Sequence, residues 1–319
     1  MPERSYSTPE AFRQALEQRI RRAAQPAGRD MGRLRQLLVF DRFLARLCAK
    51  LGDRVIVKGG LILELRLDRA RTTKDVDLRM TGDPTSTLEA LRDAGQLDLG
   101  DFLTFVVEPD RHHPTIQGEG MMYEGQRFRA EARLAGNLYG NSFGVDVGYA
   151  DALTAEPEVI DGSPFFDFVG ARPAKLRIYP RPTHIAEKLH AYTLPRARDN
   201  TRVKDLPDLA LLATLGPIDA KVLRQALVAT FEFRGTHPLP SAVPAPPEAW
   251  APVYSRMATE DELRWRTIAD VFGAVRTFLD PLLQSGRPVG GTALTWNPSE
   301  WAWMNGGTAL GTSGSVASS

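Results

Sequence analysis

The sequence predicts an α+β protein, with a mixed sheet and flanking helices in about the first 180 residues and a mostly helical region after them. Three observations predict this class. Apolar residues recur at helical spacing near the N-terminus, runs rich in β-branched and aromatic residues follow between residues 54 and 149, and Pro180 and Pro182 mark a return to helical spacing. A hydrophobic fraction of 43% over 319 residues is enough to fill a sizeable core.

The first elements are predicted from apolar spacing and glycine positions. Gly52 stops the second helix, and a short buried strand then runs into Gly59 and Gly60, which open a third helix. After a polar loop, polar and apolar side chains alternate, as in a strand with one buried face. The expected helices cover residues 8–24 and 31–50, and the expected strands cover 54–57 and 75–80.

The later elements follow the same reasoning. A helix capped near Thr85 is expected to end before Gly95, and three strands after it extend the sheet in antiparallel fashion. These strands are expected at residues 102–108, 128–134 and 143–149. The predicted domains are a sheet domain with its N-terminal helices at 1–180, a helical domain at 181–284 and a poorly ordered tail, rich in Gly, Ser and Thr, at 285–319.

Composition restricts the classes of function. With 40 basic and 39 acidic residues, the net charge of +1 cannot attract a polyanion to the whole molecule, so any nucleic-acid surface must be local. Two basic clusters are either such a surface or solvated helix faces. They contain Arg19, Arg21, Arg22, Arg29, Arg33, Arg35, Arg42, Arg46 and Lys50, and then Arg196, Arg198, Arg202 and Lys204.

Cysteine usage and hydropathy point to a cytoplasmic protein. Cys48 is the single cysteine, which excludes an internal disulfide and a thiolate zinc site. No apolar stretch is long enough to span a membrane, and the N-terminus lacks a signal-peptide profile. We therefore expect no membrane partner.

Paired carboxylates are the main chemical signal. Asp75 and Asp77 are two apart on a predicted strand, so both project from one face, where they repel each other unless a cation lies between them. Mg²⁺ suits such an oxygen-rich site because it keeps waters and accepts phosphate oxygens. Asp146 would add a third carboxylate if its strand pairs alongside. The Gly59-Gly60 turn before a helix offers backbone N–H groups to a phosphate.

Four successive motifs resemble the AbiEii/AbiGii family of toxins, which includes the MenT-type toxins. The motifs are Lys58-Gly59-Gly60, Arg71-Thr72-Thr73-Lys74-Asp75-Val76-Asp77-Leu78, Glu187-Lys188-Leu189 and Lys204-Asp205-Leu206-Pro207-Asp208-Leu209. The resemblance extends from about residue 54 to about residue 212. It implies a nucleotidyltransferase core like that of DNA polymerase β.

The resemblance also implies roles for individual residues. Asp75 and Asp77 would be catalytic metal ligands for Mg²⁺ or Mn²⁺, and Asp146 would join them as a metal ligand if its strand pairs alongside. Lys188 would contact the triphosphate, and Asp205 or Asp208 would complete the catalytic centre; both acids also fit a purely structural role at a helix start. The nucleotide would be bound by Lys58, Gly59, Gly60, Arg71, Thr73 and Lys188. Leu61 departs from the pattern, because many nucleotidyltransferases have Ser or Thr there.

The implied activity is that of the toxin in a toxin–antitoxin system. Family members transfer nucleotides from NTP to the 3′ acceptor end of tRNA, which blocks translation, and a cognate antitoxin is implied as partner. Phosphorylation of Thr72 or Thr73 would crowd the metal site with negative charge. Two other functions remain open: nucleotide transfer to a protein or small-molecule acceptor, and non-catalytic binding of nucleotide or RNA.

Overall fold

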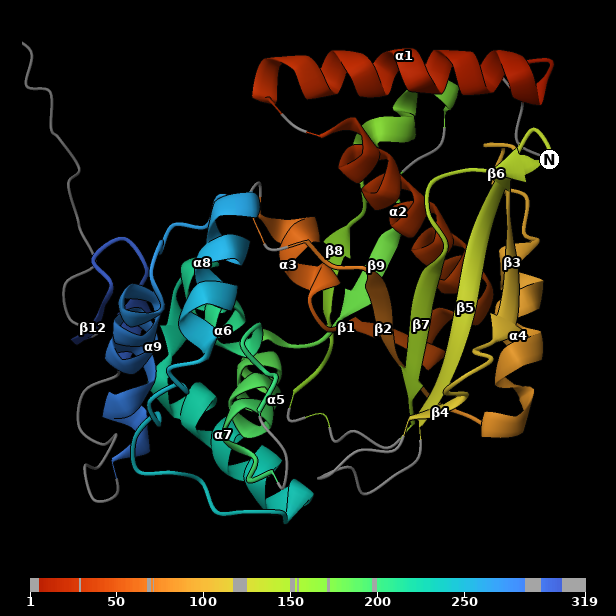
Figure 1. The fold of residues 1–319 in the computed structure, drawn as a ribbon. Helices are drawn as coiled ribbons and strands as arrows, with labels where there is room; N and C mark the ends of the chain where they lie inside the picture. The colour runs from red at the N-terminus through yellow and green to blue at the C-terminus, as the bar shows by residue number, and fades with distance from the viewer. Residues whose placement is uncertain are drawn as a thin grey trace, which may run out of the picture. The chain divides into compact units, whose positions relative to one another are not determined.

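The computed structural model describes residues 6–28, 30–67, 70, 72–116, 125–149, 153, 155–170, 173–196, 200–284 and 294–305. The chain divides into two compact units, Met1–Pro180 and Arg181–Ser319 (Figure 1). The first unit contains a mixed sheet with helices, and the second is mostly helical. The predicted α+β class is therefore confirmed.

The sheet of the first unit is mixed because two of its strand pairs are parallel. Strand β2 lies between β1, to which it is antiparallel, and β7, to which it is parallel; β1 is in turn parallel to β9. The order along the sheet is β3-β5-β7-β2-β1-β9-β8, with β4 and β6 paired to β5. The strands are β1 (Val55–Lys58), β2 (Asp75–Met80), β3 (Leu103–Pro109), β4 (Thr115–Ile116), β5 (Gly125–Leu134), β6 (Asn137–Leu138), β7 (Phe143–Gly148), β8 (Glu158–Asp161) and β9 (Lys175–Ile178).

Side chains at the helix ends define the helices of this unit. The Thr8 hydroxyl accepts a hydrogen bond from the Ala11 N–H at 3.2 Å and caps the first helix, and Asp30 caps the second through the Arg33 N–H at 2.6 Å. The first helix crosses the second (Figure 1). The helices are α1 (Pro9–Ala27), α2 (Met31–Leu51), α3 (Leu61–Arg66) and α4 (Thr87–Gly95), with 3₁₀ turns at Gly52–Arg54, Pro84–Ser86 and Pro164–Val169.

Helices α2 and α4 bury one face of the sheet. Phe43 of α2 packs against Phe105 of β3 and Phe143 of β7, with ring centroids 5.1 and 5.4 Å apart. Leu91 of α4 is fully buried in the same core. Because side chains alternate along each strand, the opposite face carries the polar residues. That polar face presents the candidate site.

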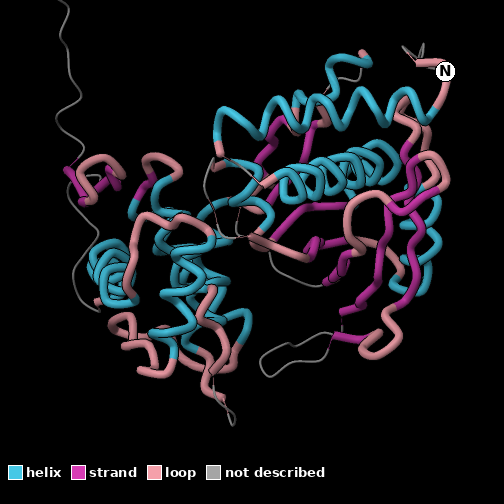
Figure 2. The backbone as a smooth tube through the Cα atoms, turned by 45° about the horizontal axis from the view of Figure 1, so that its top comes forward, coloured by secondary structure: helices cyan, strands magenta, loops and turns pink. Residues whose placement is uncertain are grey.

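Among the residues that the structure describes, the second unit contains five helices and a small sheet (Figure 2). Its elements are α5 (Arg181–Thr193), α6 (Asp205–Thr214), β10 (Ile218–Asp219), α7 (Ala220–Arg234), α8 (Trp250–Glu260), α9 (Ile268–Leu283), β11 (Leu294–Asn297) and β12 (Ala302–Asn305). Among the residues that the structure describes in both units, no helix is both long and apolar enough to cross a membrane.

The sequence predicts a poorly ordered tail at residues 285–319, but within this range β11 and β12 form an ordered hairpin. Three indoles attach it to the helices. Trp296 is fully buried and its Nε1–H donates to the Ala213 carbonyl at 2.9 Å, while Trp301 and Trp303 donate to carbonyls of α9 at 3.1 and 2.8 Å. Large aromatic area and satisfied N–H groups outweigh the low strand propensity of the surrounding Gly and Ser residues.

Candidate active site

Strand β2 places Asp75 and Asp77 on the polar face of the sheet. Val76 and Leu78 alternate with them and are fully buried against the helices. Asp75 is exposed and Asp77 is half-buried, so both carboxylates are accessible from the same side. The alternation read from the sequence is thus present in the fold.

Each of these carboxylates packs against a glycine. A Cβ at Gly59 would collide with the Asp77 carboxylate, and a Cβ at Gly144 would lie 2.5 Å from Oδ1 of Asp75. Gly59 also has a φ of +75°, a conformation that L side chains rarely adopt. Glycine is therefore needed at position 59 for two separate reasons. Gly144 was not predicted from the sequence, because its role depends on β7 lying beside β2.

Asp146 lies beside Asp77, as the prediction of a third carboxylate required. Strands β2 and β7 are parallel, and their register pairs Asp77 with Asp146. Paired residues on adjacent strands project from the same face about 4.8 Å apart. The Asp146 carboxylate is held by Arg127 of β5, whose Nε and Nη2 each lie 2.7 Å from one of its oxygens. Sequence reasoning missed Arg127.

Charged residues therefore form a ladder across four strands. The register places Lys58 opposite Asp77, Asp77 opposite Asp146, and Asp146 opposite Arg127. The pKa of Arg127 is raised, mainly because its guanidinium donates hydrogen bonds to Asp146. The negative charge of Asp75 raises this pKa further. Arg127 is therefore a permanent cation beside the acidic pair.

The loop before β2 is attached to two helices. The backbone N–H of Thr73 donates to Oε1 of Glu64 on α3 at 2.6 Å, and its carbonyl accepts from Nη1 of Arg33 on α2 at 2.8 Å. Arg33 and Glu64 are also an ion pair. These bonds fix the backbone two residues before Asp75. Thr73 itself is buried, and Arg71 lies outside the described residues.

The glycine turn leads into a short helix. Leu61 is fully buried, so the residue after the glycines serves the core, which accounts for Leu where many nucleotidyltransferases have Ser or Thr. The N–H groups of Ile62 and Leu63 donate to the carbonyls of Gly59 and Gly60 at 3.4 and 3.1 Å. Helix α3 has only six residues, so its dipole adds little to anion binding.

The second unit brings together the other predicted catalytic residues. Nζ of Lys188 on α5 lies 2.8 Å from Oδ1 of Asp205 and 2.8 Å from Oδ2 of Asp208, both on α6. The two acids are 2% and 0% exposed, and the lysine side chain is 14% exposed. One lysine and two aspartates carry a formal charge of +1 − 2 = −1. Arg202 lies 3.7 Å from Asp205 at the edge of this cluster.

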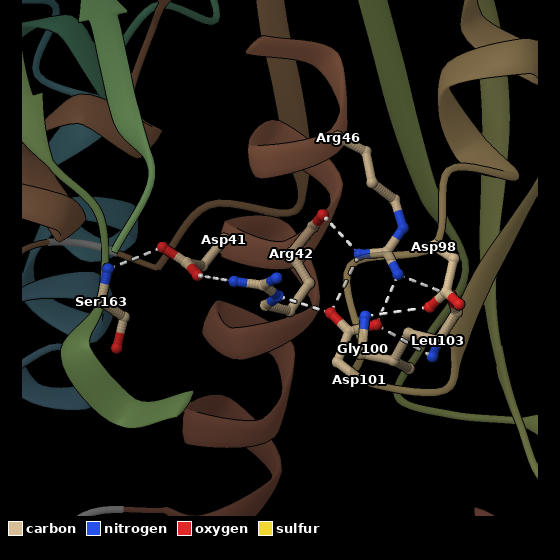
Figure 3. A network of polar contacts seen from close by, with 8 residues as sticks. All are labelled: Asp41, Arg42, Arg46, Asp98, Gly100, Asp101, Leu103 and Ser163. Atoms are coloured by element: carbon tan, nitrogen blue, oxygen red, sulfur yellow. Dashed lines mark hydrogen bonds and ion pairs between the residues drawn. The ribbon is translucent and has the colours of Figure 1, made fainter. Parts of the chain in front are cut away.

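Several residues of the N-terminal basic cluster make contacts within the fold. Arg42 and Arg46 are buried and bind Asp101 at 2.6 and 2.5 Å (Figure 3). Burial alone would raise the pKa of Asp101, but the two arginines outweigh it and lower that pKa. Arg33 and Arg35 are in ion pairs with glutamates, and Arg19 stacks on Phe168. Arg21 and Arg22 are exposed, and Arg29 is not among the described residues.

Comparison with known proteins identifies the family. A family model described as the nucleotidyl transferase AbiEii toxin of type IV toxin–antitoxin systems matches residues 42–273. The chain belongs to the AbiEii family. By family and fold, it is a nucleotidyltransferase toxin of a type IV toxin–antitoxin system. Among curated proteins, no significant match to this AbiEii chain was found.

Solved structures with similar folds include MenT4, a nucleotidyltransferase toxin of Mycobacterium tuberculosis. It is 19% identical, with a TM-score of 0.52 over 83% of this AbiEii chain and 86% of MenT4. Two Helicobacter pylori structures, JHP933 and a protein titled as a nucleotidyltransferase, are 18% and 16% identical, with TM-scores of 0.39 and 0.37. Both similarities cover 62% of this chain; they cover 80% of JHP933 and 82% of the other H. pylori protein. At this identity, MenT4 shows a shared fold.

The site of the AbiEii chain fits a divalent cation held by two carboxylates. Asp75 and Asp77 supply oxygen ligands on one open face, and Mg²⁺ is commonly bound by one or two carboxylates together with substrate phosphates. Among the described residues, no group of three or more His, Cys, Asp or Glu side chains is arranged to hold a metal ion. Asp146, the third carboxylate that the sequence predicts, is in an ion pair with Arg127.

Proposed function

We propose that this AbiEii chain is a Mg²⁺-dependent nucleotidyltransferase that transfers nucleotides from NTP to the 3′ acceptor end of tRNA and thereby blocks translation. The observation that supports the chemistry is the accessible pair Asp75 and Asp77, each seated against a glycine on the polar face of β2. Family membership supports the reaction type and the role as a toxin. An antitoxin is the expected partner, and a cytoplasmic location fits this role.

Asp75 and Asp77 would hold Mg²⁺ or Mn²⁺ in the proposed reaction. A bound divalent cation supplies charge neutralisation for the phosphates and lowers the pKa of the attacking hydroxyl. The two aspartates keep the cation on the open face, and the bonds of Arg33 and Glu64 to the Thr73 backbone limit movement of the strand that carries them. Positioning and fixed charge then account for most of the catalysis.

Nucleotide binding is proposed for the residues around the glycine turn. Lys58 is opposite Asp77 on β1, so its ammonium can reach phosphates bound on the same face. Gly59 is half-buried and Gly60 is buried, so a phosphate would reach the turn at Gly59, with Gly60 holding the turn behind it. Arg71 and Thr73 belong to the sequence that leads to Asp75.

We further propose that Lys188 contacts the triphosphate and that its two acidic partners hold it in place. Asp205 and Asp208 each lie 2.8 Å from the Lys188 ammonium and fix its position. The lysine side chain is 14% exposed, and an ammonium is a compact point charge that suits phosphate oxygens. Asp205 and Asp208 then act as positioning residues through Lys188.

The test is a labelling assay with purified protein, Mg²⁺, each α-labelled NTP and total tRNA. We expect labelled tRNA with the wild type and at least about a hundredfold less with Asp75→Ala or Asp77→Ala, the scale of losing electrostatic stabilisation at a reacting phosphate. Asp93→Ala is the matched control, because this aspartate is exposed on α4, on the far side of the sheet from the site.

The outcomes separate the three functions. Labelled tRNA that depends on both aspartates supports the proposal. Labelled protein or small molecule in a cell extract, without labelled RNA, supports another acceptor. Triphosphate binding without any transfer supports a non-catalytic module and overturns the proposal.

A further inference from the structure

The ion pair between Arg127 and Asp146 occupies the position where a third metal ligand is expected. Arg127 contacts both oxygens of the carboxylate, at 2.7 Å each. This bidentate geometry is the strongest form of an arginine–carboxylate contact. No oxygen of Asp146 is thus left without a charged donor, although the side chain is still 18% exposed.

The register places this contact where it would compete with cation binding. Asp146 is paired with Asp77 on one side and with Arg127 on the other. Its carboxylate can turn toward β2, where it would join Asp75 and Asp77, or toward β5, where it meets the guanidinium. The described structure has the second arrangement, and it contains no three-ligand metal group among the residues it describes.

Arg127 also influences the electrostatic potential over the whole site. Its charge interacts with Asp75 and Asp110 in addition to Asp146. A guanidinium is always protonated, so this charge is present at every pH at which the protein is folded. A divalent cation approaching Asp75 and Asp77 therefore meets a nearby positive charge and lacks one possible ligand.

We propose that Arg127 sets the affinity of the site for divalent cations by holding Asp146 as its counter-ion. This inference rests on the proposed function, because it concerns the same metal site. With Arg127 in place, the cation is bound by Asp75 and Asp77 and its affinity is low. Without Arg127, Asp146 turns toward β2 and becomes a third ligand.

Binding of Mn²⁺ alone, followed by the electron paramagnetic resonance signal of the free ion, tests the proposal without measuring activity. We expect Arg127→Gln to tighten Mn²⁺ binding by about tenfold or more, the scale on which residues around a metal site change its affinity. The double variant Arg127→Gln with Asp146→Asn should lose this gain, because the added ligand is removed again.

Arg129→Gln is the matched control for simple loss of positive charge. Arg129 lies two residues further along β5 on the same face, opposite Gly144, and donates to the Ser142 hydroxyl rather than to a carboxylate. We expect Arg129→Gln to tighten Mn²⁺ binding by less than about twofold, because Arg129 acts on the site only through long-range electrostatics. Thermal unfolding of each variant verifies that it is folded. Arg127→Met removes the same charge with a different side chain and should tighten Mn²⁺ binding as Arg127→Gln does.

Two results would overturn the proposal. One is equal tightening by Arg127→Gln and Arg129→Gln, and the other is a gain that persists in the double variant. If wild type and every variant fail to bind Mn²⁺, the metal dependence of the proposed function fails as well. If the wild type binds and Arg127→Gln behaves like Arg129→Gln, only the role of Arg127 is lost.

Discussion

Gly59 is the residue whose replacement tests the site most directly. A methyl group there would collide with the Asp77 carboxylate and would also require a φ near +75°. We predict that Gly59→Ala displaces Asp77 and abolishes nucleotide transfer. The backbone strain alone is expected to reduce the free energy of unfolding by about 1 kcal/mol, measured by urea denaturation.

Gly170→Ala separates strain from collision. Gly170 has a φ of +70°, but a Cβ there has no atom within 4 Å. It should lose similar stability and keep full activity. A Gly59→Ala protein that retains wild-type activity would show that Asp77 does not need its present position.

The two aspartates of β2 could be predicted from the sequence, whereas their neighbours could not. Alternation over six residues is a local signal, and it placed Asp75 and Asp77 on one face correctly. Arg127 and Gly144 belong to the site only because β5, β7 and β2 pair in a particular register. Register depends on turns and tertiary packing, which a single sequence does not specify.

At the scale of elements, α5 and α6 are joined by a buried charge cluster. Lys188→Met would change its formal charge from −1 to −2, whereas Asp208→Asn would change it to 0. We predict that Lys188→Met lowers the free energy of unfolding by about 3–5 kcal/mol, because it removes the cation that binds both buried carboxylates. Urea denaturation measures the loss.

The double variant Lys188→Met with Asp208→Asn restores the charge to −1 and should be more stable than Lys188→Met alone. If the double variant is less stable than either single variant, the cluster is not held together by charge. Activity of Asp205→Asn and Asp208→Asn, measured where both are folded, distinguishes which acid supports Lys188.

Helix α2 carries a buried network that predicts a dependence of stability on pH (Figure 3). Burial raises the pKa of Asp41, whose Oδ1 accepts the Ser163 N–H at 2.7 Å. A raised pKa in the folded state means that Asp41 stabilises the fold fully below its unfolded pKa of about 3.9, and that this contribution is lost as pH rises through the folded pKa.

Asp41→Asn keeps an acceptor for Ser163 and cannot ionise. We predict that Asp41→Asn becomes more stable relative to wild type as the pH rises from acid to neutral. Urea denaturation of both proteins at each pH measures the difference in the free energy of unfolding. Asp93→Asn, on the exposed side of α4, should show no such trend. A difference between Asp41→Asn and wild type that stays constant with pH would contradict the assignment.

Helix and strand positions were easier to predict than the contacts that order them. The predicted strand at residues 75–80 matches β2, and the helix expected at 31–50 matches α2 within one residue. Strands β8 and β9 were not predicted, because four residues with a weak alternation give little signal. The C-terminal hairpin was missed because its stability comes from three indoles that bind distant carbonyls.

At the scale of the whole molecule, charge balance limits how RNA can be held. The chain has 40 basic and 39 acidic residues, and Arg33, Arg35, Arg42 and Arg46 of α2 are engaged in ion pairs within the fold. Proteins that neutralise six to ten phosphates lose roughly 10³–10⁵ in affinity between about 50 and 200 mM salt. Because basic and acidic residues are nearly equal in number, the chain has no overall excess of positive charge to bind many phosphates at once.

We therefore predict that tRNA affinity, measured by fluorescence anisotropy, falls less than about tenfold over that salt range, as expected for about two phosphate contacts on a single strand. Arg21→Gln combined with Arg22→Gln removes two exposed arginines of α1 and should leave the salt dependence unchanged if the acceptor end is held at the polar face of the sheet. A steep salt dependence that these substitutions reduce would instead place the RNA backbone along α1, because each lost phosphate contact lowers the slope by about 0.7.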